Sequence, residues 1–160
     1  MDLAFQYIIA NGGVDSTANY PYTASDGTCD TSAASAASIS NYADVPANSD
    51  TALMNALAIG PVSVAIQADE DSFQFYTGGV MNEACGTALN HGVLAVGYGT
   101  DAASGLDYYK VKNSWGTAWG MAGYILLAKG GAMPPQGQCG ILMDSSYPIG
   151  EGARPAAALL

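Results

Sequence analysis

The chain has 160 residues, 49% of them hydrophobic and only 11% charged, and it carries a formal net charge of −10 at pH 7. Because a typical soluble domain has roughly 25% charged residues, this composition predicts a folded body that is largely buried or partnered. The few lysines and arginines form no basic stripe, which argues against nucleic acid and anionic membranes as partners. No apolar run reaches the roughly 18 residues of a membrane-spanning helix.

The N-terminal residues 1–11 carry apolar side chains at helical spacing, and Gly12-Gly13 follows them. This pattern predicts a helix that ends at the glycine pair. Residues 14–48 are rich in small polar residues and turn signals, which indicates mostly irregular structure. Within this segment, the Ala/Ser stretch from residue 32 to residue 40 is interpreted as an exposed connector.

A second helix is predicted to begin with Asp50 as its N-cap and to end near Ile59, because Gly60-Pro61 follows. The apolar period then changes to two over residues 62–66, which indicates a strand. Further strands are predicted over residues 93–98, 108–113 and 124–128. Short sequential strands of this kind favour an antiparallel sheet or barrel.

The only histidine, His91, is followed 22 positions later by Asn113, and both lie on strand-like segments. An imidazole can take the proton of a thiol nucleophile, and an asparagine amide can fix the orientation and tautomer of that imidazole. Trp115 would keep water away from their hydrogen bond. The pattern indicates thiol-dependent catalysis. The alternatives are a core histidine bonded to backbone, a turn asparagine and ordinary core tryptophans.

The three cysteines, Cys29, Cys85 and Cys139, provide no convincing nucleophile. An odd number in an extracytoplasmic protein indicates a free thiol or a missing partner; three reduced cysteines in a cytosolic protein are the alternative. A zinc site made of Cys85, His91 and Cys139 is disfavoured, because the spacing is irregular and a fourth ligand is lacking. We therefore expect neither a metal nor a cofactor.

Several segments of the chain, taken in order, resemble the papain-like cysteine peptidases. The most specific is Asn113-Ser114-Trp115-Gly116, and Asn90-His91-Gly92 precedes it. The others are residues 1–8, 11–13, 20–22, 60–66, 119–124 and 139–148. The resemblance covers roughly residues 1–149.

This resemblance implies an α+β, papain-like two-domain fold. Residues 1–43 would be part of the helical domain, residues 44–149 an antiparallel β-barrel domain, and residues 150–160 a tail or linker. The family's nucleophile lies in a Cys-Gly-Ser-Cys-Trp-like signature near the mature N-terminus, and no such signature occurs here. The chain thus resembles the C-terminal two-thirds or so of a mature peptidase.

The resemblance also implies roles for individual residues. His91 would be the general base and then the general acid, Asn113 would orient it, and Trp115 and Trp119 would cover their contact. Cys85 would pair with Cys139 rather than act as nucleophile, and Cys29 would pair with a cysteine upstream of residue 1. The main specificity pocket, which holds the second side chain before the scissile bond, would be lined by Ala65, Asn90, Gly92 and Asp144.

In that pocket, Ala65 and Gly92 would leave a roomy apolar space for a hydrophobic side chain. With Asp144 at its floor, the pocket would accept a basic side chain as well. The alternative is a solvated Asp144 without a role in binding. Peptide or protein substrates, and an N-terminal segment carrying the nucleophile, are the expected partners. The resemblance and the acidic charge are compatible with a lysosome, a vacuole or the extracellular space.

The leading hypothesis is therefore a papain-like endopeptidase acting through a thioester, of which this chain alone is inactive. One alternative is a truncated, catalytically dead pseudoenzyme that serves as a binding or structural subunit. The other is one subunit of a two-chain enzyme, whose N-terminal piece is held by Cys29.

Overall fold

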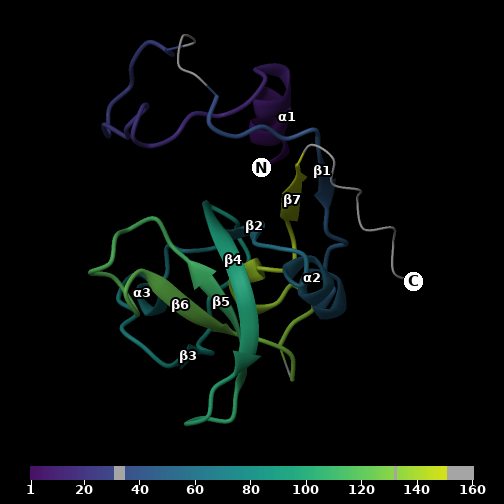
Figure 1. Cartoon of the computed structure of the whole chain (residues 1–160). Coiled ribbons are helices and arrows are strands. Elements are labelled where there is room, and N and C mark those ends of the chain that lie inside the picture. Colours follow the sequence, from purple (N-terminus) through teal and green to yellow (C-terminus); the bar gives the residue numbers. More distant parts are fainter. Residues whose placement is uncertain (31–34, 132, 151–160) are drawn as a thin grey trace. The chain divides into compact units, whose positions relative to one another are not determined.

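The computed structural model describes residues 1–30, 35–131 and 133–150, which form two compact units (Figure 1). Of the described residues, the smaller unit contains those within 2–43 and 148–150, and the larger contains residue 1 and those within 44–147. The expected tail lies outside the described residues except for Gly150, and so does part of the expected Ala/Ser connector.

The smaller unit begins with helix α1, Asp2–Ala10, which confirms the predicted N-terminal helix. The helix stops at Gly12-Gly13, where both glycines have positive φ, a backbone conformation that other residues rarely adopt. Its one buried residue, Phe5, stacks on Tyr42 with ring centroids 5.7 Å apart. Tyr42 belongs to strand β1, Asn41–Asp44.

The larger unit is built on strands β2, Val62–Ile66; β4, His91–Thr100; β5, Asp107–Lys112; and β6, Tyr124–Ala128. These strands confirm the predicted ones, and β6 agrees with its prediction to the residue. Neighbouring members pair antiparallel in the order β2-β4-β5-β6. Beyond β2 lies β7, Ser145–Ile149, and beyond β6 lies β3, Val80–Met81.

The expected antiparallel barrel is wrong in two respects. The sheet is mixed, because β3 pairs parallel with β6. It is also open, because the strand order over the described residues runs from β1 to β3 without a closing pair. The edge strand β3 has only two residues, too short to supply the long, tilted ladder that closing a barrel requires.

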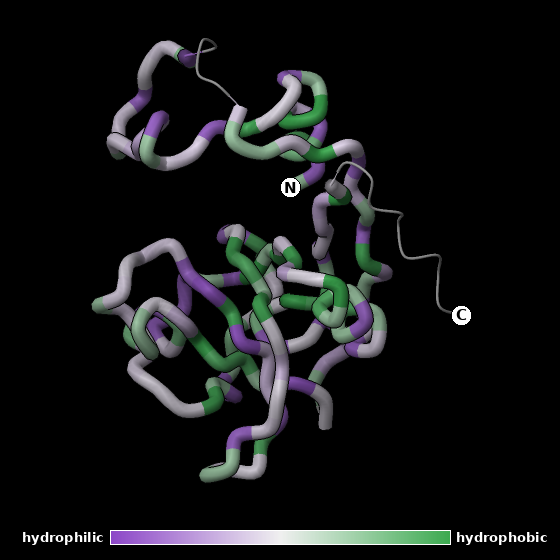
Figure 2. The backbone as a smooth tube through the Cα atoms, viewed as in Figure 1, coloured by the Kyte–Doolittle hydropathy of each residue, from purple (hydrophilic) through white to green (hydrophobic). Residues whose placement is uncertain are grey.

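The core of the larger unit follows from the alternation along its strands. Val62, Val64 and Ile66 of β2 are fully buried, whereas the intervening Ser63 and Ala65 are half-buried on the opposite face. The apolar stretches of the strands can be followed in Figure 2. The core is completed by inward residues of the neighbouring strands: Val93, Ala95, Val111, Ile125 and Leu127.

Helix α2, Asp50–Leu57, adds Leu53 to this core. Its N-cap is Ser49 rather than the predicted Asp50, since the Ser49 side chain accepts a hydrogen bond from the Ala52 backbone N–H. The short helix α3, Asp71–Gln74, and the 3-10 turn η1, Gln138–Gly140, were not predicted. Elements of three or four residues give no readable hydrophobic period. None of the described helices has the length and apolar composition of a membrane span.

Candidate active site

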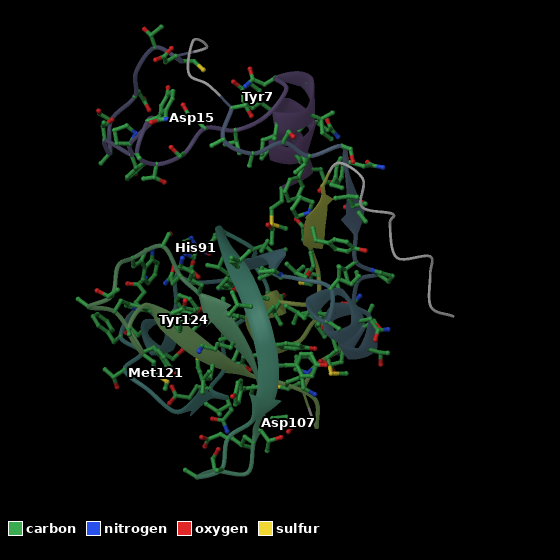
Figure 3. All side chains as sticks on the ribbon, viewed as in Figure 1. Tyr7, Asp15, His91, Asp107, Met121 and Tyr124 are labelled. Carbon is green, nitrogen blue, oxygen red and sulfur yellow. A yellow bond between two sulfur atoms is a disulfide. The ribbon has the colours of Figure 1, made fainter. Side chains whose placement is uncertain are left out.

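His91 and Asn113 lie side by side at one end of the sheet. His91 is the first residue of β4, and Asn113 directly follows β5, the antiparallel neighbour of β4. His91 Nε2 is 2.9 Å from Asn113 Oδ1. The imidazole is half-buried, whereas Asn113 is 7% exposed, so the hydrogen bond is largely removed from water. His91 is labelled in Figure 3.

The direction of this hydrogen bond follows from a second contact. The Ser114 backbone N–H donates to Asn113 Oδ1 at 2.8 Å. Because a backbone N–H can only donate, the atom that it faces must be the amide oxygen, and His91 Nε2 must then donate to the same oxygen. The neutral imidazole therefore keeps its lone pair on Nδ1. Nδ1 is the nitrogen that can accept a proton from a nucleophile.

Aromatic rings surround the imidazole. The Trp115 ring centroid lies 5.2 Å from that of His91, with the planes inclined by 30°. The Trp119 ring centroid lies 5.3 Å from that of Trp115, and the Trp119 indole N–H donates to the Gln74 carbonyl at 2.9 Å. Trp115 keeps 43% of its surface exposed. Of the two tryptophans, Trp115 is thus the one beside the imidazole, and Trp119 supports it.

Phe73 of α3 is a residue of this site that the sequence did not reveal. It is fully buried, and its ring centroid lies 6.5 Å from His91, 5.6 Å from Trp115 and 5.3 Å from Trp119. The aromatic run from Phe73 to Tyr76 was the available signal. A four-residue helix is too short to show which ring of such a run points inward.

A hollow of about 370 Å³ opens beside the imidazole. Its lining comes from the segment after β2, from α3, from the start of β4 and from the segment after β5: Ala68, Asp69, Gln74, Asn90, His91 and Trp115. Ala68, Asp69 and Gln74 were not among the predicted site residues. The side-chain amides of Gln67 and Asn90 hydrogen-bond to the Asp69 carboxylate and hold its pKa below the ordinary value.

Of the four residues expected to form the specificity pocket, three lie next to one another and Asn90 lies apart from them. Ala65 pairs with Gly92 across β2 and β4, and the Ala65 N–H donates to the Asp144 carbonyl at 2.9 Å. These three residues are therefore neighbours across the sheet. The space above Gly92 is open, and Asp144 is exposed. Asn90 instead lines the hollow beside His91, and its Oδ1 accepts a hydrogen bond from the Ala68 N–H at 2.9 Å.

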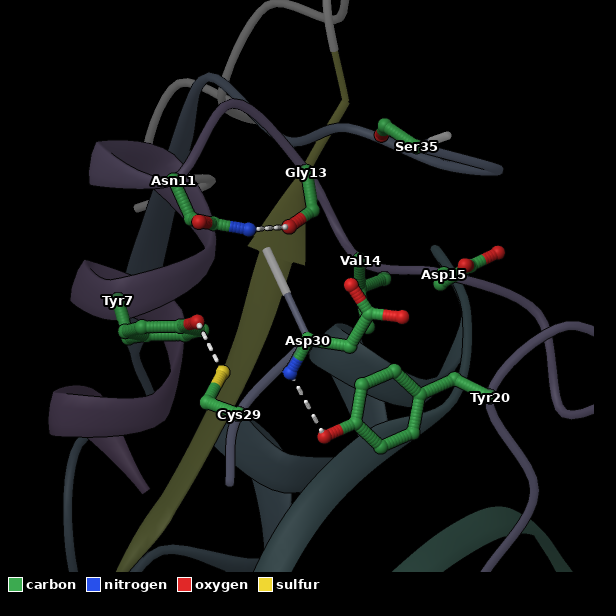
Figure 4. Close-up of a pocket in the computed structure, with 9 residues that line it drawn as sticks. All are labelled: Tyr7, Asn11, Gly13, Val14, Asp15, Tyr20, Cys29, Asp30 and Ser35. Atoms are coloured by element: carbon green, nitrogen blue, oxygen red, sulfur yellow. Dashed lines mark hydrogen bonds between the residues drawn. The ribbon is translucent and has the colours of Figure 1, made fainter. Parts of the chain in front are cut away.

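The cysteines are in two different states. Cys85 and Cys139 form a disulfide with their Cα atoms 4.8 Å apart. Cys29 is a free, exposed thiol of the smaller unit, where its Sγ lies 3.7 Å from Tyr7 Oη in a separate pocket (Figure 4). This contact raises the pKa of the Tyr7 hydroxyl. The described residues contain no cluster of His, Cys, Asp and Glu fit to hold a metal ion.

Comparison with known proteins identifies the family. Residues 1–149 match the family profile described as papain family cysteine protease. The chain belongs to the papain family of cysteine proteases. This papain-family chain is 52% identical over 157 residues to the probable cysteine protease RD21B of Arabidopsis thaliana. It is 50% identical over 160 residues to the cysteine endopeptidase RepA of Oryza sativa subsp. japonica.

Among solved structures, the papain-family chain is similar to the bromelain protease of Ananas comosus in an inhibitor complex, with a TM-score of 0.87 and 48% identity. That match covers 92% of this chain and 68% of the bromelain chain. The two curated matches cover 97% and 99% of this chain but only 33% and 42% of the relatives. The chain therefore spans between a third and about two-fifths of the length of these curated relatives.

Proposed function

We propose that this chain contributes the acid–base half of a cysteine endopeptidase active site, with His91 as the general acid and base and Asn113 as its positioning residue. The observation that carries the proposal is the 2.9 Å hydrogen bond between His91 Nε2 and Asn113 Oδ1. Because Nε2 donates in that bond, Nδ1 has a free lone pair. Membership of the papain family provides the reaction class.

In the proposed reaction, Nδ1 takes the proton of a cysteine thiol, and the thiolate attacks the carbonyl carbon of the scissile peptide bond. As the C–N bond breaks, the imidazolium returns the proton to the leaving amine, and a thioester remains. Water then attacks the thioester while Nδ1 takes its proton. The acid product leaves, and the thiol recovers its proton from the imidazolium. Trp115 shields the Asn113 hydrogen bond throughout.

We further propose that the thiol comes from a polypeptide segment outside these 160 residues. Cys85 and Cys139 are occupied by their disulfide. Cys29 is exposed and contacts Tyr7 within the smaller unit. On this proposal, residues 1–43 are part of the helical domain and residues 44–149 are the second domain. Cys29 would then pair with a cysteine of the absent segment, and the 160-residue chain by itself would hydrolyse nothing.

The proposed substrates are peptides or proteins. The second side chain before the scissile bond would lie over Ala65 and Gly92, where the surface is open, with the exposed Asp144 carboxylate accepting a basic end. The disulfide is typical of an oxidising compartment. We therefore propose a lysosome, a vacuole or the extracellular space as the site of action.

The test is the intact mass of native material, reduced and unreduced, before and after a thiol-reactive peptidase probe. The proposal expects a disulfide-linked polypeptide that takes up the probe, and labelling should fall strongly in His91→Ala. Peptide hydrolysis by the purified 160-residue chain that survives His91→Ala would refute the scheme.

A catalytically dead pseudoenzyme, acting as a binding or structural subunit, is the second candidate. The observation that favours it is the absence of a free thiol among the residues around His91, since both cysteines of the larger unit are oxidised. A single 16.2 kDa species that does not react with the probe would support the pseudoenzyme.

A further inference from the structure

The hollow beside His91 contains one carboxylate. Among its lining residues, Asp69 is the only one with an acidic side chain, and the others are apolar, amide or aromatic apart from His91 itself. Asp69 has no cationic partner, because the ion pair of the described residues joins Lys129 to Asp107. The remaining lysines, Lys110 and Lys112, lie on β5 and do not line the hollow.

Two side-chain amides, those of Gln67 and Asn90, lie next to this carboxylate. The Gln67 Oε1 accepts the Ala88 backbone N–H at 2.7 Å, and the Asn90 Oδ1 accepts the Ala68 backbone N–H at 2.9 Å. Since their oxygens are thereby fixed toward backbone donors, their NH₂ groups face the acidic segment. The Gln67 amide donates to Glu70 at 3.3 Å, and hydrogen bonding from the Gln67 and Asn90 amides lowers the pKa of the Asp69 carboxyl. The Asp69 carboxyl, which lines the hollow, therefore favours its charged form.

The register of the strands places this carboxylate on a definite side of His91. His91 pairs with Ile66, and on one side of that pair Gly92 faces Ala65. On the other side, past the end of β2, lie the Asn90 side chain and Asp69. A peptide that extends across the imidazole from the Ala65–Gly92 surface therefore reaches the Asp69 hollow after the scissile bond.

We propose that Asp69 is a specificity-determining residue that selects a basic side chain on the leaving-group side of the scissile bond. The hollow offers an exposed Trp115 ring and the Gln74 amide to the stem of such a side chain and the Asp69 carboxylate to its charged end. This inference rests on the proposed function for its assignment of the leaving-group side. The binding preference itself needs no nucleophile.

Peptide binding to the 160-residue chain tests the inference without catalysis. The probes are acetylated tetrapeptide amides of the form Gly-Gly-X-Ala, in which X is lysine, norleucine or glutamate. Binding is followed through the indole N–H signals of the chain's two tryptophans, which Trp119→Phe assigns. The Trp115 signal should move, and at low salt lysine should bind roughly threefold or more tightly than glutamate. The difference should shrink in 0.5 M salt.

Three variants sharpen the test. Asp69→Asn should bring the lysine-to-glutamate affinity ratio to about one, and Asp69→Lys should invert it. Glu83→Gln removes the same charge from an exposed residue outside the hollow and should leave the ratio unchanged. Equal affinities in the wild type, an unmoved Trp115 signal, or a preference that survives in Asp69→Asn would overturn the inference. Asp69→Asn and Asp69→Lys test the role of Asp69 independently, so either one suffices if the other fails to fold.

Failure of the inference is separate from failure of the proposed function. If the chain binds the lysine peptide selectively but the material does not react with the thiol-reactive probe, the inference about Asp69 is supported and the proposed peptidase function is contradicted. If the material reacts with the probe but the chain binds the lysine and glutamate peptides equally, the proposed function is supported and the inference about Asp69 is contradicted.

Discussion

Tyr109 Oη donates a 2.6 Å hydrogen bond to Asp50 Oδ1, joining the middle of β5 to the first residue of α2. The Tyr109 side chain is 1% exposed, so this hydroxyl depends on Asp50 for its partner. Burial raises the pKa of the Tyr109 hydroxyl, and the hydrogen bond and negative charge of Asp50 raise it further. The contact therefore contributes to stability only while Tyr109 is protonated.

Replacing Tyr109 by phenylalanine should lower the free energy of unfolding by about 2 kcal/mol at pH 7, because a hydrogen bond to a charged group is lost. Urea denaturation measures the change. Tyr108, the half-buried neighbour on β5, is the matched control, and Tyr108→Phe should change stability by less than about 0.5 kcal/mol. Equal effects of the two substitutions would contradict the assignment.

The stability of the wild type should also fall at alkaline pH. The folded pKa of Tyr109 lies above its ordinary value of 10.0, so the folded state holds this proton more tightly than the unfolded state. The resulting stability is complete below about pH 10 and declines as pH rises above it. The difference in unfolding free energy between wild type and Tyr109→Phe should therefore narrow between pH 8 and pH 11. A constant difference would reject this linkage.

Phe73 and Phe75 should respond very differently to the same substitution. Phe73 is fully buried beneath the His91 and Trp115 rings, whereas Phe75 is 75% exposed at the end of the same helix. Phe73→Ala should cost about 3–5 kcal/mol of stability through the cavity that it leaves. Phe75→Ala should cost less than about 0.5 kcal/mol. Thermal or urea unfolding distinguishes the two, and similar losses would show that α3 is packed differently.

The tautomer of His91 is directly measurable, because the chain has one histidine. Nitrogen NMR above pH 8 should find the neutral ring protonated on Nε2, since Asn113 Oδ1 accepts that proton. Asn113→Ala should produce a mixture of tautomers. A wild-type ring protonated on Nδ1 would exclude the base assignment.

The disulfide and the free thiol should contribute unequally to stability. Cys85 and Cys139 are separated by 54 positions, and replacing both by alanine should cost about 2–4 kcal/mol. Cys29→Ser alters only an exposed thiol and should change the unfolding free energy by less than about 0.5 kcal/mol. Comparable losses in unfolding measurements would mean that Cys29 packs as tightly as the disulfide.

The sequence predicted both longer helices and the strands β2, β4, β5 and β6, but not the five-residue strand β7. Strand β6 was predicted to the residue, and α1 within one residue at each end. The error at α2 has a tertiary cause. Asp50 has a good capping side chain, but its carboxylate accepts from Tyr109, which is 59 positions away, and Ser49 caps the helix instead. The parallel pairing of β3 with β6 is equally non-local, and this is why the barrel prediction failed.

For the candidate site, the residue types and order around His91 and Asn113 were enough to indicate thiol chemistry, because few other uses require that combination. Their 2.9 Å contact, the buried Phe73 and the Asp69 hollow came only from the folded chain. The hollow joins residues 68, 69, 74, 90, 91 and 115, which are adjacent only because β2, β4 and β5 pair in register. The sequence therefore shows which reactive side chains the chain carries, whereas the pairing of strands determines which of those side chains lie next to one another.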